Sequence, residues 1–524
     1  MQAIINQTTT ENFNNWSESD CGETSSESTT ETFQYNGKVL IIGCGSIGLG
    51  VIPLLLRHIQ FSKTNPISIW TAEDRKEEAL QVGKKYNIPV SIGYLTEANY
   101  RNNLEQFNLR DGDFILNLSV DVGSIDLIRW CQSRGILYLD TCIEPWPGTY
   151  TNPELSVSKR SNYALREEAL QLAKSFPENS PTAIITHGAN PGMVSHFVKQ
   201  ALLNIAETIQ ETNSNSSSSS SSITATTTFP SNKSAWAEFA KSLGVQAIHI
   251  SERDTQYTNL PRNSTDFFNT WSVDGFLSEG CQPAEMGWGT HEKNLPSDGA
   301  RHDFGCGSAI YLNRPGAGTR VRSWTPRGGP HLGFLITHSE AISIADYFTA
   351  KRGDEVTFRP TVHYAYRPCD TAVLALEELA VQNWDPEYFT NKKVMVDEIV
   401  DGYDDLGVLI MGTNPLTSKP YAYWYGSELD SKTAKQRAEY NSATTLQVTS
   451  AILAAFIWAI KNPRKGVVEP EELPFDEILD VMEPYISPIN GVFTDWNPLT
   501  GRGKLFPESI DTSDPWQFKN LRVE

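Results

Sequence analysis

The opening stretch of regular hydrophobic patterning combines a strand signal, a group of glycines and a helix signal. Residues 38–42 are mostly apolar and β-branched, and apolar residues then recur at helical spacing over 47–59. Gly43, Gly45 and Gly48 lie between them and form the pattern G-x-G-x-x-G. This order predicts a turn that holds the pyrophosphate of a dinucleotide, because the glycines admit phosphate and the helix N-terminus offers free N–H groups. A glycine turn that only packs is the alternative.

Strand and helix signals continue to alternate after this turn. Strands are predicted at 67–70, 90–93, 114–118, 137–140 and 182–187, with helices at 73–85, 97–107, 124–134 and 194–209. Further along, the signals are mixed, with strands at 247–250, 308–312 and 320–323 and helices at 372–381 and 443–461. The predicted fold class is therefore α/β, with an N-terminal Rossmann doubly wound parallel sheet and a mixed α+β domain for substrate binding and dimerisation.

Two polar segments interrupt this pattern and set the predicted boundaries. Residues 1–36 carry too few apolar side chains to fold and contain acids without Lys or Arg, which predicts a disordered tail and argues against a targeting peptide. Residues 211–233 contain a serine run and are predicted to be a surface insertion. We therefore expect a Rossmann domain at 37–210, a substrate domain at 234–440, and a C-terminal helical segment at 441–524 whose apolarity suggests that it packs back on the first domain.

Composition narrows the possible partners and the compartment. The net charge of −20 argues against a nucleic-acid partner. The seven cysteines never form C-x-x-C, which argues against a disulfide framework and a zinc site, predicts no metal, and favours a cytoplasmic protein. The apolar block 451–460 is shorter than the roughly 20 residues of a membrane span, so we expect a buried helix and no membrane partner.

The end of the second predicted strand departs from the usual dinucleotide site. An Asp or Glu normally binds the ribose there, whereas this chain has Trp70. Glu73 or Asp74 is expected to reach the ribose, or Trp70 to stack on adenine. The acidic neighbours favour NAD over NADP, although Arg75 follows directly.

Candidate ligand-binding residues come from strand ends in the first domain and from acidic segments of the second. A ligand in a doubly wound sheet lies beyond the carboxyl ends of the strands. In the second domain, acids stand beside tryptophan and histidine in HISERDTQ, NTWSVDGFLSEG and THSEAIS, and this combination suits an alkylammonium ion. Solvated or structural acids are the alternative for each of them. The predicted cofactor contacts are Gly43, Gly45, Ser46, Ile47, Gly48, Glu73, Asn117, Ser119, Thr141, Ala189 and Met193.

Residues 37–524 resemble bacterial-type homospermidine synthases, which are NAD-dependent relatives of the saccharopine dehydrogenases. The resemblance rests on long motifs, among them IIGCGSIGLG, LDTCIEPW, GANPGMVSHFVKQAL, HISERDTQ, NTWSVDGFLSEG, QPAEMGWGTHE, RPTVHYAY and VDGYDDLGVL. It departs from the family in the N-terminal tail, the serine-rich insertion and Trp70.

The resemblance implies a reaction on diamines. NAD oxidises putrescine to an imine, a second amine displaces ammonia or a diamine, and the NADH formed reduces the new Schiff base. Two putrescines, or putrescine with spermidine, give homospermidine. The implied catalytic residues are Glu252 for an ammonium end, Trp271 for the cationic imine, Asn190 for the reacting amine, and His338. The implied substrate contacts are Glu279, Glu340, Asp121, Glu144 and Asp404.

The general base and the type of reaction each have more than one candidate. Either His338 or Glu252 is expected to be the general base. A saccharopine-type dehydrogenase with net redox change and a non-catalytic NAD-binding protein are the rival interpretations, and the dehydrogenase needs Arg or Lys for substrate carboxylates, for which Arg253 and Arg320 are the candidates. The expected partners are small diamines or polyamines and further copies of the chain, as a dimer or a dimer of dimers.

Overall fold

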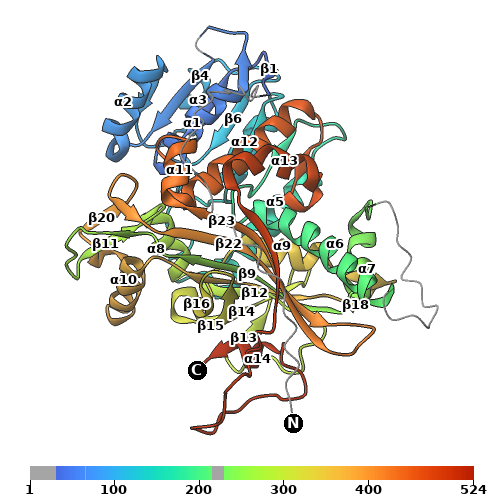
Figure 1. The fold of residues 1–524 in the computed structure, drawn as a ribbon. Helices are drawn as coiled ribbons and strands as arrows, with labels where there is room; N and C mark the ends of the chain where they lie inside the picture. The colour runs from blue at the N-terminus through green and yellow to red at the C-terminus, as the bar shows by residue number, and fades with distance from the viewer. Residues whose placement is uncertain (1–30, 65, 215–228) are drawn as a thin grey trace, which may run out of the picture.

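Two sheets organise the protein, and the site lies between them. The structure is a computed structural model that describes residues 31–64, 66–214 and 229–524. The first sheet lies at the top of Figure 1, coloured blue to cyan, and the second sheet crosses the middle and lower part. The prediction of a parallel sheet followed by a mixed α+β part is confirmed.

The first sheet is a doubly wound parallel sheet. Its order is β5 (Val90–Ile92), β4 (Ile67–Thr71), β2 (Val39–Ile42), β6 (Phe114–Asn117), β7 (Leu137–Asp140), β8 (Ala183–Ile184) and β24 (Val467–Val468). Every residue of β2 is buried, because helices cover both faces. α1 (Ser46–His58) and α2 (Lys76–Tyr86) pack on one face, and α3 (Tyr100–Glu105), α4 (Ser124–Gln132) and α5 (Asn162–Ala173) pack on the other.

The second sheet is mixed and larger. Its main path runs β13 (Gly299–Arg301), β14 (Ala309–Pro315), β12 (Pro283–Gly287), β19 (Thr361–Arg367), β9 (Val245–Asp254), β22 (Tyr403–Thr413), β23 (Pro420–Asp430) and β25 (Ile489–Thr494), and β15 (Arg320–Thr325), β16 (Gly329–Phe334) and β26 (Arg522–Val523) join beside β19. β19 and β9 are parallel neighbours, so side chains in register lie on the same face. β9 extends beyond the predicted strand 247–250 and carries Glu252 within the sheet.

The remaining helices and several pairs of short strands complete the fold. The helices are α6 (Met193–Ser214), α7 (Lys233–Ser242), α8 (Val273–Cys281), α9 (Ser339–Tyr347), α10 (Asp370–Val381), α11 (Ser431–Arg437), α12 (Ala443–Lys461), α13 (Phe475–Ile486) and α14 (Phe518–Leu521). Pairs of short strands are β1 (Phe33–Tyr35) with β3 (Ile59–Phe61), β10 (Tyr257–Thr258) with β21 (Ile399–Asp401), β11 (Asp266–Asn269) with β20 (Asn391–Val394), and β17 (Ala350–Arg352) with β18 (Glu355–Phe358).

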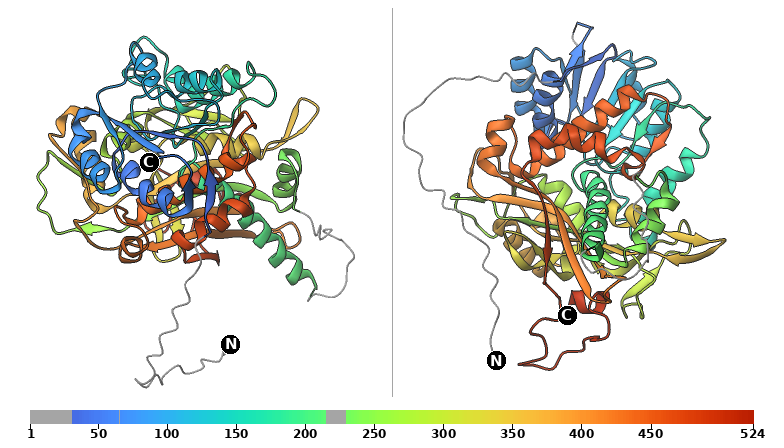
Figure 2. Two further views of the ribbon diagram at one scale, coloured as in Figure 1. Left: turned by 90° about the horizontal axis from the view of Figure 1, so that it is seen from above. Right: turned by 45° about the vertical axis from the view of Figure 1, so that its right-hand side comes forward.

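The helix α12 connects the two sheets. It packs against α1, and the chain beyond it adds β24 to the edge of the first sheet. In the right-hand view of Figure 2 the orange and red helices lie directly against the blue elements. α12 has the length and hydropathy of a membrane span, yet 89% of that window is buried inside the protein, as expected of a core helix.

Several predicted elements end at other residues in the structure, and the expected C-terminal helical segment 441–524 also contributes the strands β24, β25 and β26. Two further differences concern the expected tail and the expected insertion. Phe33–Tyr35 lies within the predicted tail 1–36 but forms β1, because it pairs with Ile59–Phe61. α6 continues to Ser214, five residues past the predicted helix 194–209 and into the predicted insertion. Residues 1–30 of the expected tail and 215–228 of the expected insertion lie outside the described residues.

Candidate functional site

A cleft of about 550 Å³ opens where the carboxyl ends of the first-sheet strands face the second sheet. One end is formed by the glycine turn and the residues after β4, β6 and β7. The other end is formed by side chains of β9, β19 and the starts of α8 and α9. The predicted site residues that line it are Gly43, Gly45, Ser46, Ile47, Asn117, Ser119, Thr141, Glu144, Ala189, Asn190, Glu252, Trp271, Glu279 and His338.

The glycine turn is shaped for an anion. Gly43 has a φ of 94°, in the left-handed region that side chains disfavour. A Cβ on Gly45 would meet nothing within 4 Å, so this position faces open space, whereas a Cβ on Gly48 would lie 2.4 Å from the carbonyl oxygen of Gly43. Gly45 caps α1 without a side-chain acceptor, which leaves the first N–H groups of the helix to a ligand. These features fit the pyrophosphate of a dinucleotide.

Trp70 does not take part in the cleft, so its expected stacking on adenine is wrong. Its side chain is only 7% exposed, donates a 2.7 Å hydrogen bond from Nε1 to the carbonyl of Gly93, and packs edge-on against Phe107. β4 ends one residue later than predicted, at Thr71. Trp70 is therefore an interior residue of β4, and its side chain points into the helix layer. Thr71 and Ala72 line the cleft at the strand end instead.

The acids that line the cleft at the expected ribose position are Asp74 and Glu78, and Glu73 is not among them. Asp74, Arg75 and Glu78 line the cleft, whereas Glu73 is exposed and pairs with Lys76 at 2.9 Å. Two more predicted cofactor contacts are structural. Gly48 packs on Gly43 behind the turn, and Met193 is fully buried at the start of α6. Neither of them lines the cleft.

Glu252 is more deeply buried than the lining acids Glu144 and Glu279. It is 2% exposed, and its Oε2 accepts hydrogen bonds from Asn190 Nδ2 at 3.0 Å and from the hydroxyl of Tyr364. Burial raises the pKa of Glu252 to about 8, and the hydrogen bond from Tyr364, the charge of His338 and the hydrogen bond from Asn190 limit this rise. A carboxyl group with this pKa can take and return protons near neutral pH.

His338 lies between two carboxylates. Nε2 is 3.0 Å from Glu279 and Nδ1 is 3.2 Å from Glu340. Burial alone would lower the pKa of His338, but the two carboxylates outweigh it and raise this pKa well above its ordinary value. An imidazolium with both nitrogens engaged has no free lone pair, so of the two candidate bases the geometry favours Glu252.

Glu144 lines the cleft and carries an unpaired carboxylate oxygen. Its Oε2 is buried and has no hydrogen-bond partner among the residues that the structure describes. Burial, together with the charges of Glu279 and Asp121, raises the pKa of Glu144 to about 8. An unpaired acceptor beside other carboxylates suits an ammonium group.

Three predicted substrate contacts do not line the cleft. Glu340 lies behind His338. Asp404 is fully buried on β22 and accepts a 2.5 Å hydrogen bond from Thr444, which lines the cleft in its place. Asp121 follows the lining residue Val120 and has a φ of 63°. Spacing alone could not separate these supporting acids from those that face the cleft.

Sequence reasoning missed two features of the cleft. Tyr364, in the motif RPTVHYAY, lines it and binds Glu252, and strand alternation places Tyr366 on the same face. At the mouth, Asp274 of α8 lies 3.7 Å from Arg75 and 3.0 Å from Lys392, which links the first sheet to the second part. Only the folded chain brings these three charges together.

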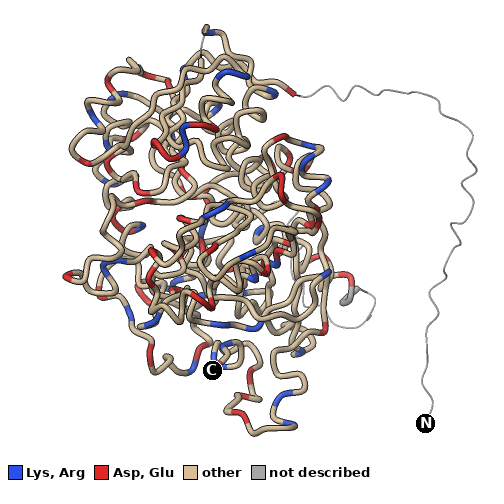
Figure 3. Tube along the Cα trace, turned by 90° about the vertical axis from the view of Figure 1, so that its left-hand side faces the viewer, with Lys and Arg blue, Asp and Glu red and all other residues tan. Residues whose placement is uncertain are grey.

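The candidate carboxylate-binding arginines of the second part lie elsewhere. Arg253 donates a hydrogen bond to the carbonyl of Gly328, and Arg320 pairs with Glu377 at 3.3 Å. Lys and Arg are interspersed with Asp and Glu along the trace (Figure 3). Within the described ranges, no group of three or more His, Cys, Asp or Glu has the geometry to hold a metal ion.

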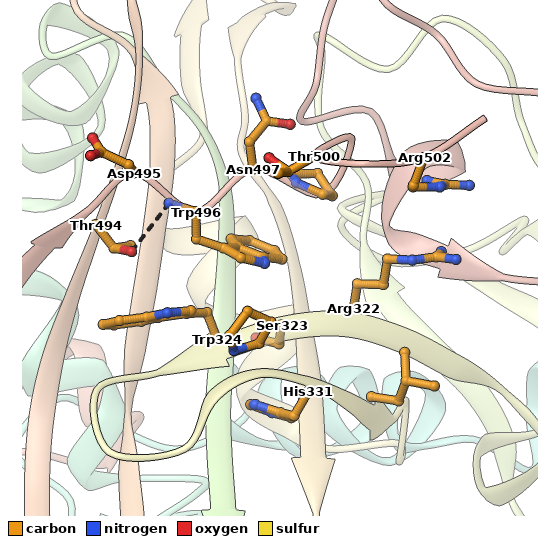
Figure 4. A pocket seen from close by; sticks show the side chains of 13 residues that line it. Arg322, Ser323, Trp324, His331, Thr494, Asp495, Trp496, Asn497, Thr500 and Arg502 are labelled. Carbon is orange, nitrogen blue, oxygen red and sulfur yellow. Dashed lines mark hydrogen bonds between the residues drawn. The ribbon is translucent and has the colours of Figure 1, made fainter. Parts of the chain in front are cut away.

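A second pocket, of about 670 Å³, lies between the β15–β16 hairpin and the chain after β25 (Figure 4). Trp324 and Trp496 lie on facing sides of it. Its arginines are engaged by the protein, since Arg502 pairs with Glu508 at 2.6 Å and Arg322 binds the carbonyl of Arg522 at 2.8 Å. This pocket contains neither the glycine turn nor the acids of the cleft.

Comparison with known proteins defines the class of this site. A family model described as "Saccharopine dehydrogenase NADP binding domain" matches residues 39–184, and one described as "Saccharopine dehydrogenase C-terminal domain" matches residues 188–494. The chain therefore has the saccharopine dehydrogenase arrangement over most of its length.

Individual relatives narrow the class further. The chain is 45% identical to a homospermidine synthase of Mesorhizobium japonicum over 94% of this chain and 97% of the relative, and 45% identical to one of Blastochloris viridis over 94% and 98%. The crystal structure of a homospermidine synthase of Legionella pneumophila in complex with NAD matches with a TM-score of 0.82 at 42% identity, covering 94% of this chain and 99% of that one. The chain belongs to the homospermidine synthase family, as its motifs indicated.

Proposed function

We propose that the protein makes homospermidine from putrescine, using two putrescines or putrescine with spermidine, with NAD as a recycled cofactor. The observation that carries this proposal is that one cleft holds both the glycine turn and the group Glu252, Asn190 and Trp271. The curated relatives with this architecture are homospermidine synthases.

The residues of the cleft fit NAD, and different residues are placed for its pyrophosphate and for its ribose. Gly43 and Gly45 with the N-terminus of α1 hold the pyrophosphate, and Asp74 is placed for the ribose. When bound, NAD takes two electrons from the first diamine and returns them to the Schiff base formed with the second, so no net redox change occurs.

The protein supplies proton transfer, charge stabilisation and enclosure. Glu252 takes a proton from the reacting ammonium group, and Asn190 holds that carboxylate toward the first sheet. Trp271 offers its ring face to the cationic imine, a contact worth about 0.5 to 2 kcal/mol. Glu144 and Glu279 bind the ammonium groups. Glu252 is only 2% exposed, and limited access of water at this position protects the imine from hydrolysis to an aldehyde.

The charge of the inner cleft favours amines over amino acids. A saccharopine-type dehydrogenase must bind substrate carboxylates, for which arginine or lysine is suited. In the described lining, Arg75 and Lys392 pair with Asp274, while His338 pairs with Glu279 and the acids Glu144 and Glu252 interact electrostatically with this pair. Putrescine, with an ammonium group at each end, matches this distribution.

The proposal is tested by product analysis. Purified protein is incubated with putrescine and NAD, and homospermidine, ammonia and NADH are measured together. Homospermidine and ammonia without accumulating NADH support the proposal. Accumulating NADH without homospermidine would support the dehydrogenase, and no product of either kind would leave only a binding role.

The chain is proposed to work in the cytoplasm as a homodimer or a dimer of dimers, which the family resemblance supports. Light scattering of the purified protein measures the assembly state.

A further inference from the structure

Two tyrosines of β19 lie side by side beneath the candidate catalytic groups. Tyr364 and Tyr366 are two residues apart on one strand, so their side chains share a face of the sheet. Their rings stack with centroids 5.1 Å apart and an interplanar angle of 4°. Both are buried, and Tyr366 stands in register with Glu252 on the neighbouring β9.

Tyr364 fixes the carboxyl group of Glu252. Its hydroxyl donates to Oε2, the same oxygen that accepts from Asn190 at 3.0 Å. Because both donors bind Oε2, the other oxygen is left for a substrate amine. The ring of His338 lies against Tyr364, with centroids 4.4 Å apart, and limits the movement of the phenol.

Tyr366 fixes the indole of Trp271 in a similar way. Trp271 donates a 3.1 Å hydrogen bond from Nε1 to the hydroxyl of Tyr366. Phe276 packs against both rings, with centroids 5.2 Å from Trp271 and 5.5 Å from Tyr366. The orientation of the indole face therefore depends on an acceptor from the same strand that holds Glu252.

We propose that Tyr364 and Tyr366 form a positioning pair, in which Tyr364 orients the carboxylate that exchanges protons and Tyr366 orients the ring that faces the cation. This inference rests on the proposed function, because it assigns both tyrosines to the same diamine reaction. Because Tyr364 and Tyr366 stack on one another within β19, this strand sets the distance between the carboxylate of Glu252 and the indole of Trp271. Neither tyrosine is itself a catalytic residue in this account.

Removing the hydroxyl of Tyr364 and removing that of Tyr366 should have different effects on the pKa of Glu252. Apart from them, the titratable groups facing Glu252 are Asp254 on β9, Asp404 on β22 and His338 at the start of α9. A hydrogen bond donated to a carboxylate stabilises its charged form, so removing the Tyr364 hydroxyl raises the pKa of Glu252 above about 8. The Tyr366 hydroxyl makes no hydrogen bond with Glu252, and its removal leaves this pKa nearly unchanged.

Tyr364→Phe and the matched control Tyr366→Phe separate these roles. For Tyr364→Phe we expect the acidic limb of the kcat profile to move up by about one pH unit. For Tyr366→Phe we expect that limb to stay in place and kcat/KM for putrescine to fall several-fold, because the indole that faces the cationic imine is no longer held. An unmoved limb in Tyr364→Phe, or an equal shift in both variants, would overturn the proposal.

A second measurement keeps the inference testable without turnover. The infrared band of the protonated Glu252 carboxyl, identified by its loss in Glu252→Gln, reports the titration of that group directly. It should persist to higher pH in Tyr364→Phe than in wild type or Tyr366→Phe, and the same titration in all three proteins would refute the role of Tyr364. Failure of wild type to make homospermidine, with the infrared shift present, would instead refute the proposed function.

Discussion

Asn190, which follows β8 of the first sheet, donates a 3.0 Å hydrogen bond to Glu252 on β9 of the second sheet. This bond crosses the boundary between the part of the protein that suits a dinucleotide and the part that suits a diamine. Asn190 also directly precedes Pro191 in a turn that lines the same cleft as the glycine turn. The position of the base relative to the cofactor site therefore depends on the packing of the two sheets.

Replacing Glu252 by glutamine tests its role as the base. The amide keeps the size of the side chain but cannot accept a proton, so we expect turnover to fall by about 10²- to 10⁴-fold. NAD binding, measured by calorimetry, should be nearly unchanged, because the glycine turn lies at the other end of the cleft. Full activity in Glu252→Gln would remove this residue from the mechanism.

Trp271 is tested by two substitutions of different severity. Phe retains an aromatic face with a weaker attraction for cations, whereas Ala removes the face altogether. We expect kcat/KM for putrescine to fall by about 2- to 30-fold in Trp271→Ala and by less in Trp271→Phe. Equal values for the two variants would show that the ring face does not stabilise the cation.

Gly45 and Gly48 provide a matched pair within one turn. Gly45 faces open space, so Gly45→Ala should fold normally and weaken NAD binding by about tenfold or more, because the methyl group occupies the phosphate site. Gly48→Ala places its methyl against the carbonyl of Gly43 and should destabilise the protein by about 1 to 3 kcal/mol. Thermal melting and NAD calorimetry measure both effects, and the reverse pattern would contradict the assignment.

We expect the thermal stability of the protein to depend on pH, because folding raises the pKa of buried acids. Folding raises the pKa of Glu144 and of Glu252 from 4.5 to about 8, so their contribution to stability is present below the lower value and is lost as pH rises through about 8. The melting temperature should therefore fall as the pH rises from about 5 to about 8 and level off above that. Putrescine should stabilise more at the higher pH, because it then meets ionised carboxylates. A putrescine effect that declines over this range would contradict the account.

The sequence predicted those features that local patterns determine. The strand at Val39–Ile42, the glycine turn and α1 follow from periodicity, and the motifs assigned Glu252, Asn190 and Trp271 to one site. The role of Trp70 could not be read correctly, because β4 ends at Thr71, whose side chain points to the opposite face of the sheet from that of Trp70.

Long-range packing explains most of what the sequence did not reveal. Asp404 and Glu340 were indistinguishable from lining acids until the fold placed Thr444 and His338 in front of them. Tyr364 gave no chemical signal of its own, since its importance comes from its register beside β9. Residues far apart in the chain contribute these contacts, and their neighbours depend on the sheet order.

In the proposed reaction, the two electrons taken from putrescine return within one turnover to the Schiff base formed from it. The direct measurement uses putrescine deuterated at the carbons that bear nitrogen, together with NAD and an excess of unlabelled NADH, and analyses homospermidine by mass spectrometry. If the cofactor is recycled while bound, the product retains all the deuterium of its two precursors. Homospermidine that has lost one deuterium per molecule to the unlabelled NADH pool would contradict the account.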